Sequence, residues 1–353
     1  MKNSLPLLPP NKDLETKRVL KQLARTYRYL SELKGYADTI PNKHMLINAV
    51  TIKEAKDSSE IENIVTTHDE IYKAISSKSY NNPSAKEVVN YREALWHGYE
   101  EIKKNSVITT NLLIEIQRII ERNESGIRKL PGTVLLNENS GDTIYTPPFG
   151  EDVIRNYLHN LEIYMNDSDH VDPLIKLAVI HYQFESIHPF YDGNGRTGRI
   201  LNVLYLVKNE LLDSPILYLS GYIIRNKDLY YSLLQKLHND NQWEEWILYI
   251  LTGIEETAEE ALLLSKKINN EIEIMSAEVK EKLPKIYSKE LMDLLFYEFY
   301  TKTNYIEAGL GVTRKTAAGY LSELEKNGFL VSERIGRERI YKNNRLFKII
   351  SGS

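Results

Sequence analysis

The sequence predicts a mainly α-helical protein with one β-hairpin in the middle of the chain and a winged helix-turn-helix at the C-terminus. Apolar residues recur mostly at three- and four-residue spacings, and alternating strand patterns are scarce. The clearest exception is 132–146, where β-branched residues lie on both sides of a turn sequence. After Pro284, three short helical patterns precede two strand patterns, which is the order of a winged helix-turn-helix.

Length and composition narrow the class of protein. The 353 residues suffice for two or three domains, and 45 Lys and Arg against 49 Asp and Glu give a net charge of −4. The absence of cysteine excludes disulfides, thiolate zinc sites, iron-sulfur clusters held by cysteine and a cysteine nucleophile. Neither a signal peptide nor an apolar run of the roughly 20 residues that span a membrane is present. We therefore expect a soluble, unprocessed cytoplasmic protein without membrane contact.

The first half of the chain predicts helices at 27–34 and 51–76. A loop at 81–84 follows, in which Ser84 can cap the next helix. The hairpin at 132–146 has a tight turn made of Asn139, Ser140, Gly141 and Asp142.

Two helices occupy the centre of the chain. Asp172 as the cap and Pro173 at the first helical position open a helix that runs to about residue 187. The next helix, 195–212, is apolar on nearly all sides, so we expect it to be the central core helix.

The last third begins with a charged helical connector over 253–283. Helices are then predicted at 287–297 and 305–308, with a turn at 309–311. Thr313 caps a third helix that ends near residue 327, and two short strands lie within 330–341 around Gly336.

The segment 188–199, HPFYDGNGRTGR, joins the two central helices and can bind an anion. Gly193 and Gly195 let the backbone approach a ligand closely, and the helix that follows presents unpaired N–H groups. Arg196 and Arg199 lie three residues apart on its first turn and add forked donors suited to phosphate.

Two further side chains of this loop suggest a reaction. Asp192 is placed to hold Mg²⁺ that bridges phosphates, and His188 can take up a proton near neutral pH. Each residue alone is more often a turn or surface residue, but their joint occurrence favours transfer of a phosphate-containing group to a hydroxyl. Zinc bound by His181, Glu185 and His188 is disfavoured because the H-E-x-x-H order is missing.

At every defined position this segment resembles the signature HPFx(D/E)GNGRxxR of Fic-domain protein adenylyltransferases. The resemblance extends over about residues 58–251, and the C-terminal winged helix resembles that of one bacterial subgroup. It implies a Fic-type helical core with a β-hairpin flap, and transfer of AMP from ATP to a Ser, Thr or Tyr hydroxyl of a target protein. We divide the chain accordingly into an N-terminal helical region (1–109), a Fic domain (110–252), a helical connector (253–284) and a winged helix-turn-helix (285–353).

The resemblance also implies roles for single residues. His188 would be the catalytic base, Asp192 the Mg²⁺ ligand, and Phe190 an apolar anchor of the loop. The hairpin would align an extended segment of the target by β-augmentation, unless it is a plain surface hairpin. Tyr230 would contact the adenine, unless it belongs to the core. The nucleotide-binding residues would be Asp192, Gly193, Asn194, Gly195, Arg196, Thr197, Gly198, Arg199 and Tyr230.

Ser58, Glu62 and Asn63 match the family's inhibitory pattern (S/T)xxxE(G/N). Ser58 and Glu62 lie at i and i+4 and therefore on one face of a helix. A carboxylate paired with Arg199 would occupy the cation that orients the γ-phosphate of ATP. We therefore expect Glu62 to inhibit the enzyme, whereas the ordinary interpretation is a solvated acidic face. In some relatives this glutamate helps water to remove AMP, so de-AMPylation stays open.

Two rival functions remain at this point. A Fic relative could use another nucleotide or a phosphocholine donor. Alternatively, the chain could be a DNA-binding regulator that senses nucleotide, because residues 285–353 contain 12 basic and 8 acidic residues. That segment therefore carries a net charge of +4, and the rest of the chain carries a net charge of −8. Winged helices also dock proteins, and the oligomeric state, a homodimer included, is open. The cations of the third helix and wing are Arg314, Lys315, Arg334, Arg337 and Arg339.

Overall fold

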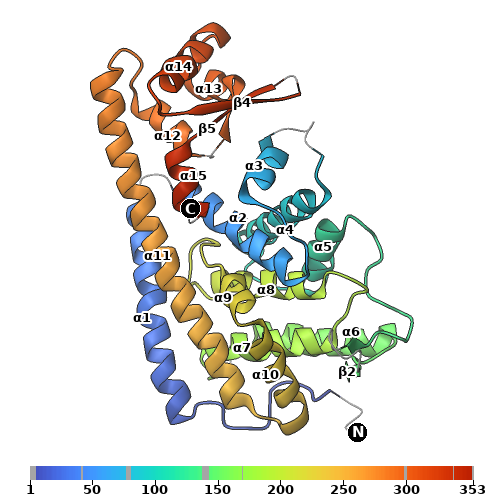
Figure 1. Cartoon of the computed structure of the whole chain (residues 1–353). Helices are drawn as coiled ribbons and strands as arrows, with labels where there is room; N and C mark the ends of the chain where they lie inside the picture. Colours follow the sequence, from blue (N-terminus) through green and yellow to red (C-terminus); the bar gives the residue numbers. More distant parts are fainter. Residues whose placement is uncertain are drawn as a thin grey trace.

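The computed structural model describes residues 5–40, 43–76, 81–136, 143–168, 170–297, 300–336 and 338–351. Helices dominate this part of the chain, as predicted (Figure 1). The helices before the loop at 188–193 are α1 (Lys17–Thr39), α2 (Lys43–Ile61), α3 (His68–Ser76), α4 (Pro83–Asn105), α5 (Thr110–Glu121), α6 (Glu151–Asn166) and α7 (Pro173–Ile187). They are followed by α8 (Asn194–Lys208), α9 (Leu219–Arg225), α10 (Lys227–Asp240) and α11 (Trp243–Lys282).

Helix α8 lies at the centre of the core, as its sequence predicts. Its buried side chains include Ile200, Leu201, Val203 and Leu204, and it packs against α4, α5 and α7. The predicted start of α7 is confirmed, because the Asp172 side chain accepts a hydrogen bond from the backbone N–H of Leu174 at 2.8 Å.

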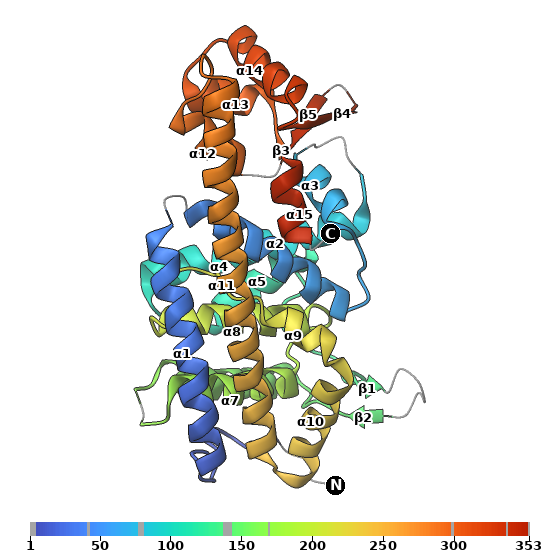
Figure 2. The same cartoon turned by 60° about the vertical axis from the view of Figure 1, so that its left-hand side comes forward.

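Helices α11 and α1 form a spine along one side of the molecule. Helix α11 has 40 residues and is therefore about 60 Å long, and α1 packs along it in both views (Figures 1 and 2). The predicted connector at 253–283 is thus not a separate element, since it continues a helix that begins at Trp243. Ile254, Ala258 and Ile268 are buried on its packed side.

The prediction of one helix over 51–76 is wrong in one respect, because the structure has two helices, α2 and α3, in this region. Helix α2 ends at Ile61, and Asn63 follows in the left-handed conformation (φ 62°), which asparagine tolerates better than most residues. Helix α3 then starts with a capping box: Thr67 N–H donates to Glu70 Oε2 at 2.9 Å, and Glu70 N–H donates to Thr67 Oγ1 at 3.2 Å.

Two helix starts also differ from the prediction. Helix α4 is capped by Asn82 and not by Ser84, because Pro83 takes the first helical position and the cap must precede it. Helix α1 extends well beyond 27–34, from its cap Thr16 to Thr39.

The predicted hairpin is present as β1 (Leu135–Leu136) and β2 (Thr143–Tyr145), which pair antiparallel. Leu135 pairs with Tyr145 and Leu136 with Thr143, so an irregularity lies between the two pairs. The predicted turn, Asn139 to Asp142, lies outside the described residues.

The C-terminal module, residues 285–351 where described, has the predicted order of three helices and a hairpin. Its elements are α12 (Lys289–Tyr297), β3 (Tyr300–Thr301), α13 (Thr303–Leu310), α14 (Arg314–Lys326), β4 (Val331–Ile335), β5 (Glu338–Lys342) and α15 (Asn344–Ser351). Thr313 caps α14 as predicted, and Gly311 (φ 64°) ends α13. The sequence did not predict β3, which completes a sheet of order β3-β5-β4, or α15, which packs on α11.

The C-terminal module is attached to α3 by a cluster of charged residues. Asp69 of α3 accepts hydrogen bonds from Tyr300 Oη at 2.5 Å and Lys342 Nζ at 3.2 Å. Lys73 of α3 forms ion pairs with Asp69 at 2.7 Å and with Glu333 of β4 at 3.1 Å. These contacts connect all three strands of the module to one helix.

Within the described residues, no helix combines the length and the apolar character that a membrane span requires.

We predict that Asp69→Asn destabilises the protein by about 1 kcal/mol near neutral pH, since the partly exposed cluster is screened by solvent. Burial raises the pKa of Asp69, but hydrogen bonds from Lys73, Tyr300 and Lys342 outweigh it, and the pKa falls to about 2. The stabilisation is therefore complete above the ordinary pKa of about 3.9 and is lost as the pH falls through 2. Urea unfolding at several pH values measures the difference.

The matched control for this cluster is Glu124→Gln, which removes an exposed carboxylate paired with Arg118. It should leave the free energy of unfolding unchanged. A difference between wild type and Asp69→Asn that grows on acidification would contradict the prediction.

Candidate functional site

The loop between α7 and α8 has a closed and internally bonded conformation. His188 ends α7 in the left-handed region (φ 48°), and Gly193 (φ 79°) precedes the first residue of α8. The buried side chain of Asn194 holds the turn from inside. Its Oδ1 accepts from Phe190 N–H and its Nδ2 donates to Phe190 O, both at 2.8 Å. Phe190 itself is fully buried, in keeping with an apolar anchor.

His188 is neutral at neutral pH. Burial lowers its pKa to about 4, and the nearby positive charge of Arg128 acts in the same direction. The backbone carbonyl of Glu185 and the carboxylates of Glu62 and Asp192 oppose this shift but are weaker. A neutral imidazole can accept a proton, which is what a general base requires.

Arg199 lies on the first turns of α8 with only 3% of its side chain exposed. Its Nε donates to Ser58 Oγ at 2.7 Å, and its Nη2 donates to Ser58 O at 2.9 Å and to Glu62 Oε1 at 2.8 Å. The structure therefore brings Ser58 and Glu62 onto one guanidinium from 137 or more residues away. Asn63, the third residue of this pattern, is exposed and lies in the turn after α2.

The Glu62 carboxylate covers the N-terminal turn of α8. A Cβ placed on Gly195 would collide with Glu62 Oε1, so the missing side chain of this glycine makes room for the carboxylate. Burial alone would raise the pKa of Glu62, but Arg199, Arg196 and Lys227 outweigh it and keep the group ionised. An anion thus already occupies the side of the helix where an anion site is predicted.

Arg196 is also paired with carboxylates. Its Nη2 lies 2.7 Å from Glu121 Oε1, and its Nη1 lies 3.2 Å from Glu87 Oε2. Asp192 lies further away at 3.8 Å. Glu121 reaches Gly193 closely enough that a Cβ there would meet its Oε1 at 2.6 Å. Both predicted phosphate-binding arginines are therefore held by acidic side chains from other helices.

Asp192 presents its carboxylate to solvent, with 76% of the side chain exposed. Its Oδ1 accepts from Gly193 N–H at 2.7 Å, and its backbone carbonyl accepts from Gln117 at 3.2 Å. In the described part of the chain, no group of three or more acidic or histidine side chains is placed to hold a metal ion. Any ion bound here would need most of its ligands from a bound molecule and water.

Thr197 and Gly198 lie on the buried side of α8. Gly198 allows close approach of Glu185, whose Oε1 would lie 2.5 Å from a Cβ at this position. Burial raises the pKa of Glu185 to about 7. His181 has both ring nitrogens near partners, Tyr230 Oη at 2.9 Å and Asn202 Nδ2 at 3.1 Å. It belongs to the core and not to a metal site with Glu185 and His188.

Tyr230 is buried, with 2% of its surface exposed, and its ring packs against His181 and Trp246. Its position supports the alternative interpretation of a core residue more than contact with a bound base. The neighbouring Tyr231 is 44% exposed.

Sequence reasoning missed Arg128, Glu87 and Glu121. Arg128 lies between α5 and β1 and is buried against carbonyl groups of the loop between α7 and α8, including His188 O at 2.7 Å. Each of the three is a single charged residue outside any recognisable motif. Only their neighbours in space distinguish them from surface residues.

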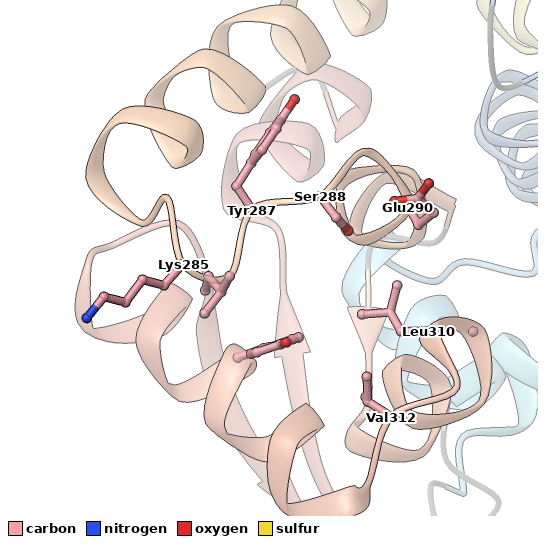
Figure 3. A pocket seen from close by; sticks show the side chains of 9 residues that line it. Lys285, Tyr287, Ser288, Glu290, Leu310 and Val312 are labelled. Atoms are coloured by element: carbon pink, nitrogen blue, oxygen red, sulfur yellow. The ribbon is translucent and has the colours of Figure 1, made fainter.

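Figure 3 shows a pocket of about 330 Å³ that lies in the C-terminal module and not at the loop. Lys285, Tyr287 and Ser288 line it from the segment before α12, and Leu310 and Val312 line it from α13 and the turn that follows. None of the predicted site residues borders this pocket.

Three family models match the chain. The Fic/DOC family N-terminal model matches residues 20–100, and the Fic/DOC family model matches residues 107–206 and thus includes the whole loop. A model of the C-terminal domain of SoFic-like protein adenylyltransferases matches residues 272–346.

Individual relatives agree with these models. A probable protein adenylyltransferase of Aquifex aeolicus is 27% identical over 198 residues, which are 54% of this chain and 56% of that protein. A protein adenylyltransferase of Caenorhabditis elegans is 33% identical over 64 residues, 18% of this chain and 13% of its own length. The chain thus aligns with about half of the first relative and with a small part of the second. The crystal structure of a Fic family protein from Desulfovibrio desulfuricans shares the fold, with a TM-score of 0.61 at 18% identity over 95% of this chain and 98% of that one.

We predict that Asn194→Ala destabilises the protein by about 2 kcal/mol, because it leaves the buried N–H and C=O of Phe190 without partners. Asn105→Ala is the control, since it removes one exposed bond to Glu101 and should cost less than about 0.5 kcal/mol. Denaturant unfolding of both variants compares them. Equal effects of the two substitutions would show that Asn194 does not hold the loop.

Proposed function

Because the chain belongs to the Fic/DOC family, we propose that it is a protein adenylyltransferase, which transfers AMP from ATP to a Ser, Thr or Tyr hydroxyl of a target protein. The observation that carries the proposal is the arrangement of one loop. A neutral, half-buried His188 lies at one end, and two arginines lie at the other, on the first turns of a helix whose N-terminus is framed by glycines.

The reaction uses His188 as the base. The target hydroxyl gives its proton to the imidazole while its oxygen forms a bond to the α-phosphorus of ATP. The bond between that phosphorus and the oxygen bridging to the β-phosphate breaks, and pyrophosphate leaves. The N–H groups at the start of α8, together with Arg196 and Arg199, stabilise the negative charge on the phosphates.

Mg²⁺ is the expected cofactor, and the residues at the loop fit it. This ion keeps several waters and commonly binds through one or two carboxylates together with substrate phosphates. The exposed carboxylate of Asp192 beside the start of α8 meets this requirement. When bound, the ion would neutralise phosphate charge and favour departure of pyrophosphate.

Glu62 inhibits the enzyme from within the chain. Its carboxylate pairs with Arg199 at 2.8 Å and lies over Gly195, where a phosphate group would otherwise approach. ATP bound to this form would lack the cation that orients its terminal phosphate, so its α-phosphate would not be aligned for attack.

The DNA-binding alternative has less support. Several cations of the C-terminal module are used inside the protein. Arg339 pairs with Glu325, Lys342 with Asp69, and Arg345 with Glu278. Arg314, Lys315 and Arg334 are exposed, and Arg337 lies outside the described residues. The loop therefore supports the transferase best, with a protein as its partner.

We predict that Glu62→Gly raises auto-adenylylation about tenfold or more, because Arg199 becomes available to the nucleotide. The control is Glu60→Gly, which removes a carboxylate two residues earlier that pairs with Lys56 and not with Arg199. Incorporation of label from α-³²P-ATP measures the rate, and labelled GTP, CTP and UTP test the choice of donor. If Glu62→Gly is no more active than Glu60→Gly, Glu62 is not an inhibitor.

We predict that His188→Ala in the Glu62→Gly background lowers the rate of transfer about a hundredfold or more, since the base is removed. Nucleotide affinity, measured by calorimetry, should stay within about threefold because the imidazole is not part of the anion site. Adenylylation that survives the loss of His188 would refute its role as the base.

A further inference from the structure

Arg128 is a buried cation that contacts the catalytic loop from outside the motif. Only 1% of its surface is exposed. Its guanidinium donates to His188 O at 2.7 Å, to Ile187 O at 3.2 Å and to Pro148 O. Its own backbone N–H donates to Pro189 O at 2.9 Å. One residue thus bonds to three consecutive carbonyl groups around His188.

These bonds lie at the C-terminal end of α7. The last carbonyl groups of a helix have no partner within the helix, and their partial negative charge favours a cation. His188 also has a positive φ of 48°, a conformation that non-glycine residues adopt only when their surroundings enforce it. The charge-assisted bonds from Arg128 to Ile187 O and His188 O, the carbonyl groups before and after the Cα atom of His188, provide such surroundings.

The same residue fixes both ends of the hairpin segment. Arg128 lies at the start of that segment, and Pro148, which accepts one of its bonds, lies just after β2. Ile127 forms an antiparallel bridge with Phe190 of the loop. On β2, Tyr145 Oη donates to Ser186 O at 2.8 Å. The hairpin segment and the backbone of His188 are therefore both bonded to Arg128.

We infer that Arg128 is a positioning residue, which sets the distance between the His188 imidazole and a substrate hydroxyl presented by the hairpin. The inference rests on the proposed function, in which His188 is the base and the hairpin aligns the target segment. A displacement of about 1 Å between reacting groups can cost about a hundredfold in rate, so a residue that fixes both groups has a large effect without touching either reactant.

The charge of Arg128 supports the same role. Burial is the main cause of the low pKa of His188, and Arg128 lowers it further. The groups that oppose them are the backbone carbonyl of Glu185 and the carboxylates of Glu62 and Asp192. Loss of the cation should therefore let the imidazole hold its proton at a higher pH.

The test compares Arg128→Met and Arg128→Lys in the active Glu62→Gly parent. Lysine keeps the charge, but its compact ammonium lacks the planar fork with which the guanidinium of Arg128 bonds to His188, Ile187 and Pro148. At saturating ATP we expect the maximal auto-adenylylation rate to fall about thirtyfold or more with methionine and about tenfold with lysine. The affinity for α,β-methylene-ATP, measured by calorimetry, should stay within about threefold, because Arg128 does not contact the predicted anion site.

The pH profile separates positioning from simple structural support. The acid limb of the rate should move to higher pH in Arg128→Met and stay in place in Arg128→Lys, since only the former removes the charge. Arg118→Met is the control, because Arg118 is exposed and pairs only weakly with exposed Glu124. The Arg118→Met substitution should leave the maximal rate, the nucleotide affinity and the pH profile of the parent unchanged.

Clear outcomes overturn the inference. If both Arg128 variants keep rates within about threefold of the parent, or if the loss of rate is matched by loss of nucleotide affinity, Arg128 does not position the base. If Arg128→Met does not fold, Arg128→Lys alone decides: a rate within about threefold of the parent would refute the positioning role of Arg128. A parent that transfers no AMP refutes the proposed function itself, which is a distinct result.

Discussion

The guanidinium of Arg199 is buried at the start of α8, a helix that is buried on nearly all sides, and this constrains much of the surrounding structure. A buried cation without partners would cost several kcal/mol, so the fold has to supply acceptors for it. Ser58 and Glu62 of the α2 end provide them through three hydrogen bonds. The pairing raises the pKa of Arg199 against the effect of burial. The end of α2 consequently lies against α8, and the break before α3 follows directly after it.

A second buried polar contact holds α2 in place one turn earlier. Glu54 accepts hydrogen bonds from Tyr91 Oη of α4 at 2.8 Å and from Ser220 N–H and Oγ of α9 at 3.0 and 2.5 Å. Burial raises its pKa to about 7, although these bonds and the charge of Arg199 act against the shift. Helix α2 is therefore attached by polar contacts to three helices of the core, and its last turn has little freedom to move away from the loop.

The C-terminal module lies on the other side of the same segment. The short stretch 62–67 joins Glu62, which is held by Arg199, to the capping box that starts α3. Helix α3 in turn bonds to all three strands of the module through Asp69 and Lys73. The proposed inhibitory carboxylate thus lies directly after α2, and the C-terminal module contacts α3, the next helix along the chain.

Local chemistry in the sequence was enough to predict the helical class, the loop and its glycines. The same holds for the caps at Asp172 and Thr313 and the common face of Ser58 and Glu62. These features depend on residues only a few positions apart, and at that distance helix geometry and backbone dihedral preferences determine the local structure. A capping box at Thr67 and Glu70 was equally readable and would have divided the predicted helix over 51–76.

Tertiary structure alone decided which partners the charged residues would find. Arg128 bonds to carbonyl groups 59 and 60 residues away, and Arg196 pairs with Glu121 and Glu87 at separations of 75 and 109 residues. It also placed Tyr230 in an aromatic core and made the charged stretch after Gly253 one side of a packed helix. A charged or aromatic residue has the same local preferences whether it is buried or exposed. Its role is therefore set by the groups that the folded chain brings against it.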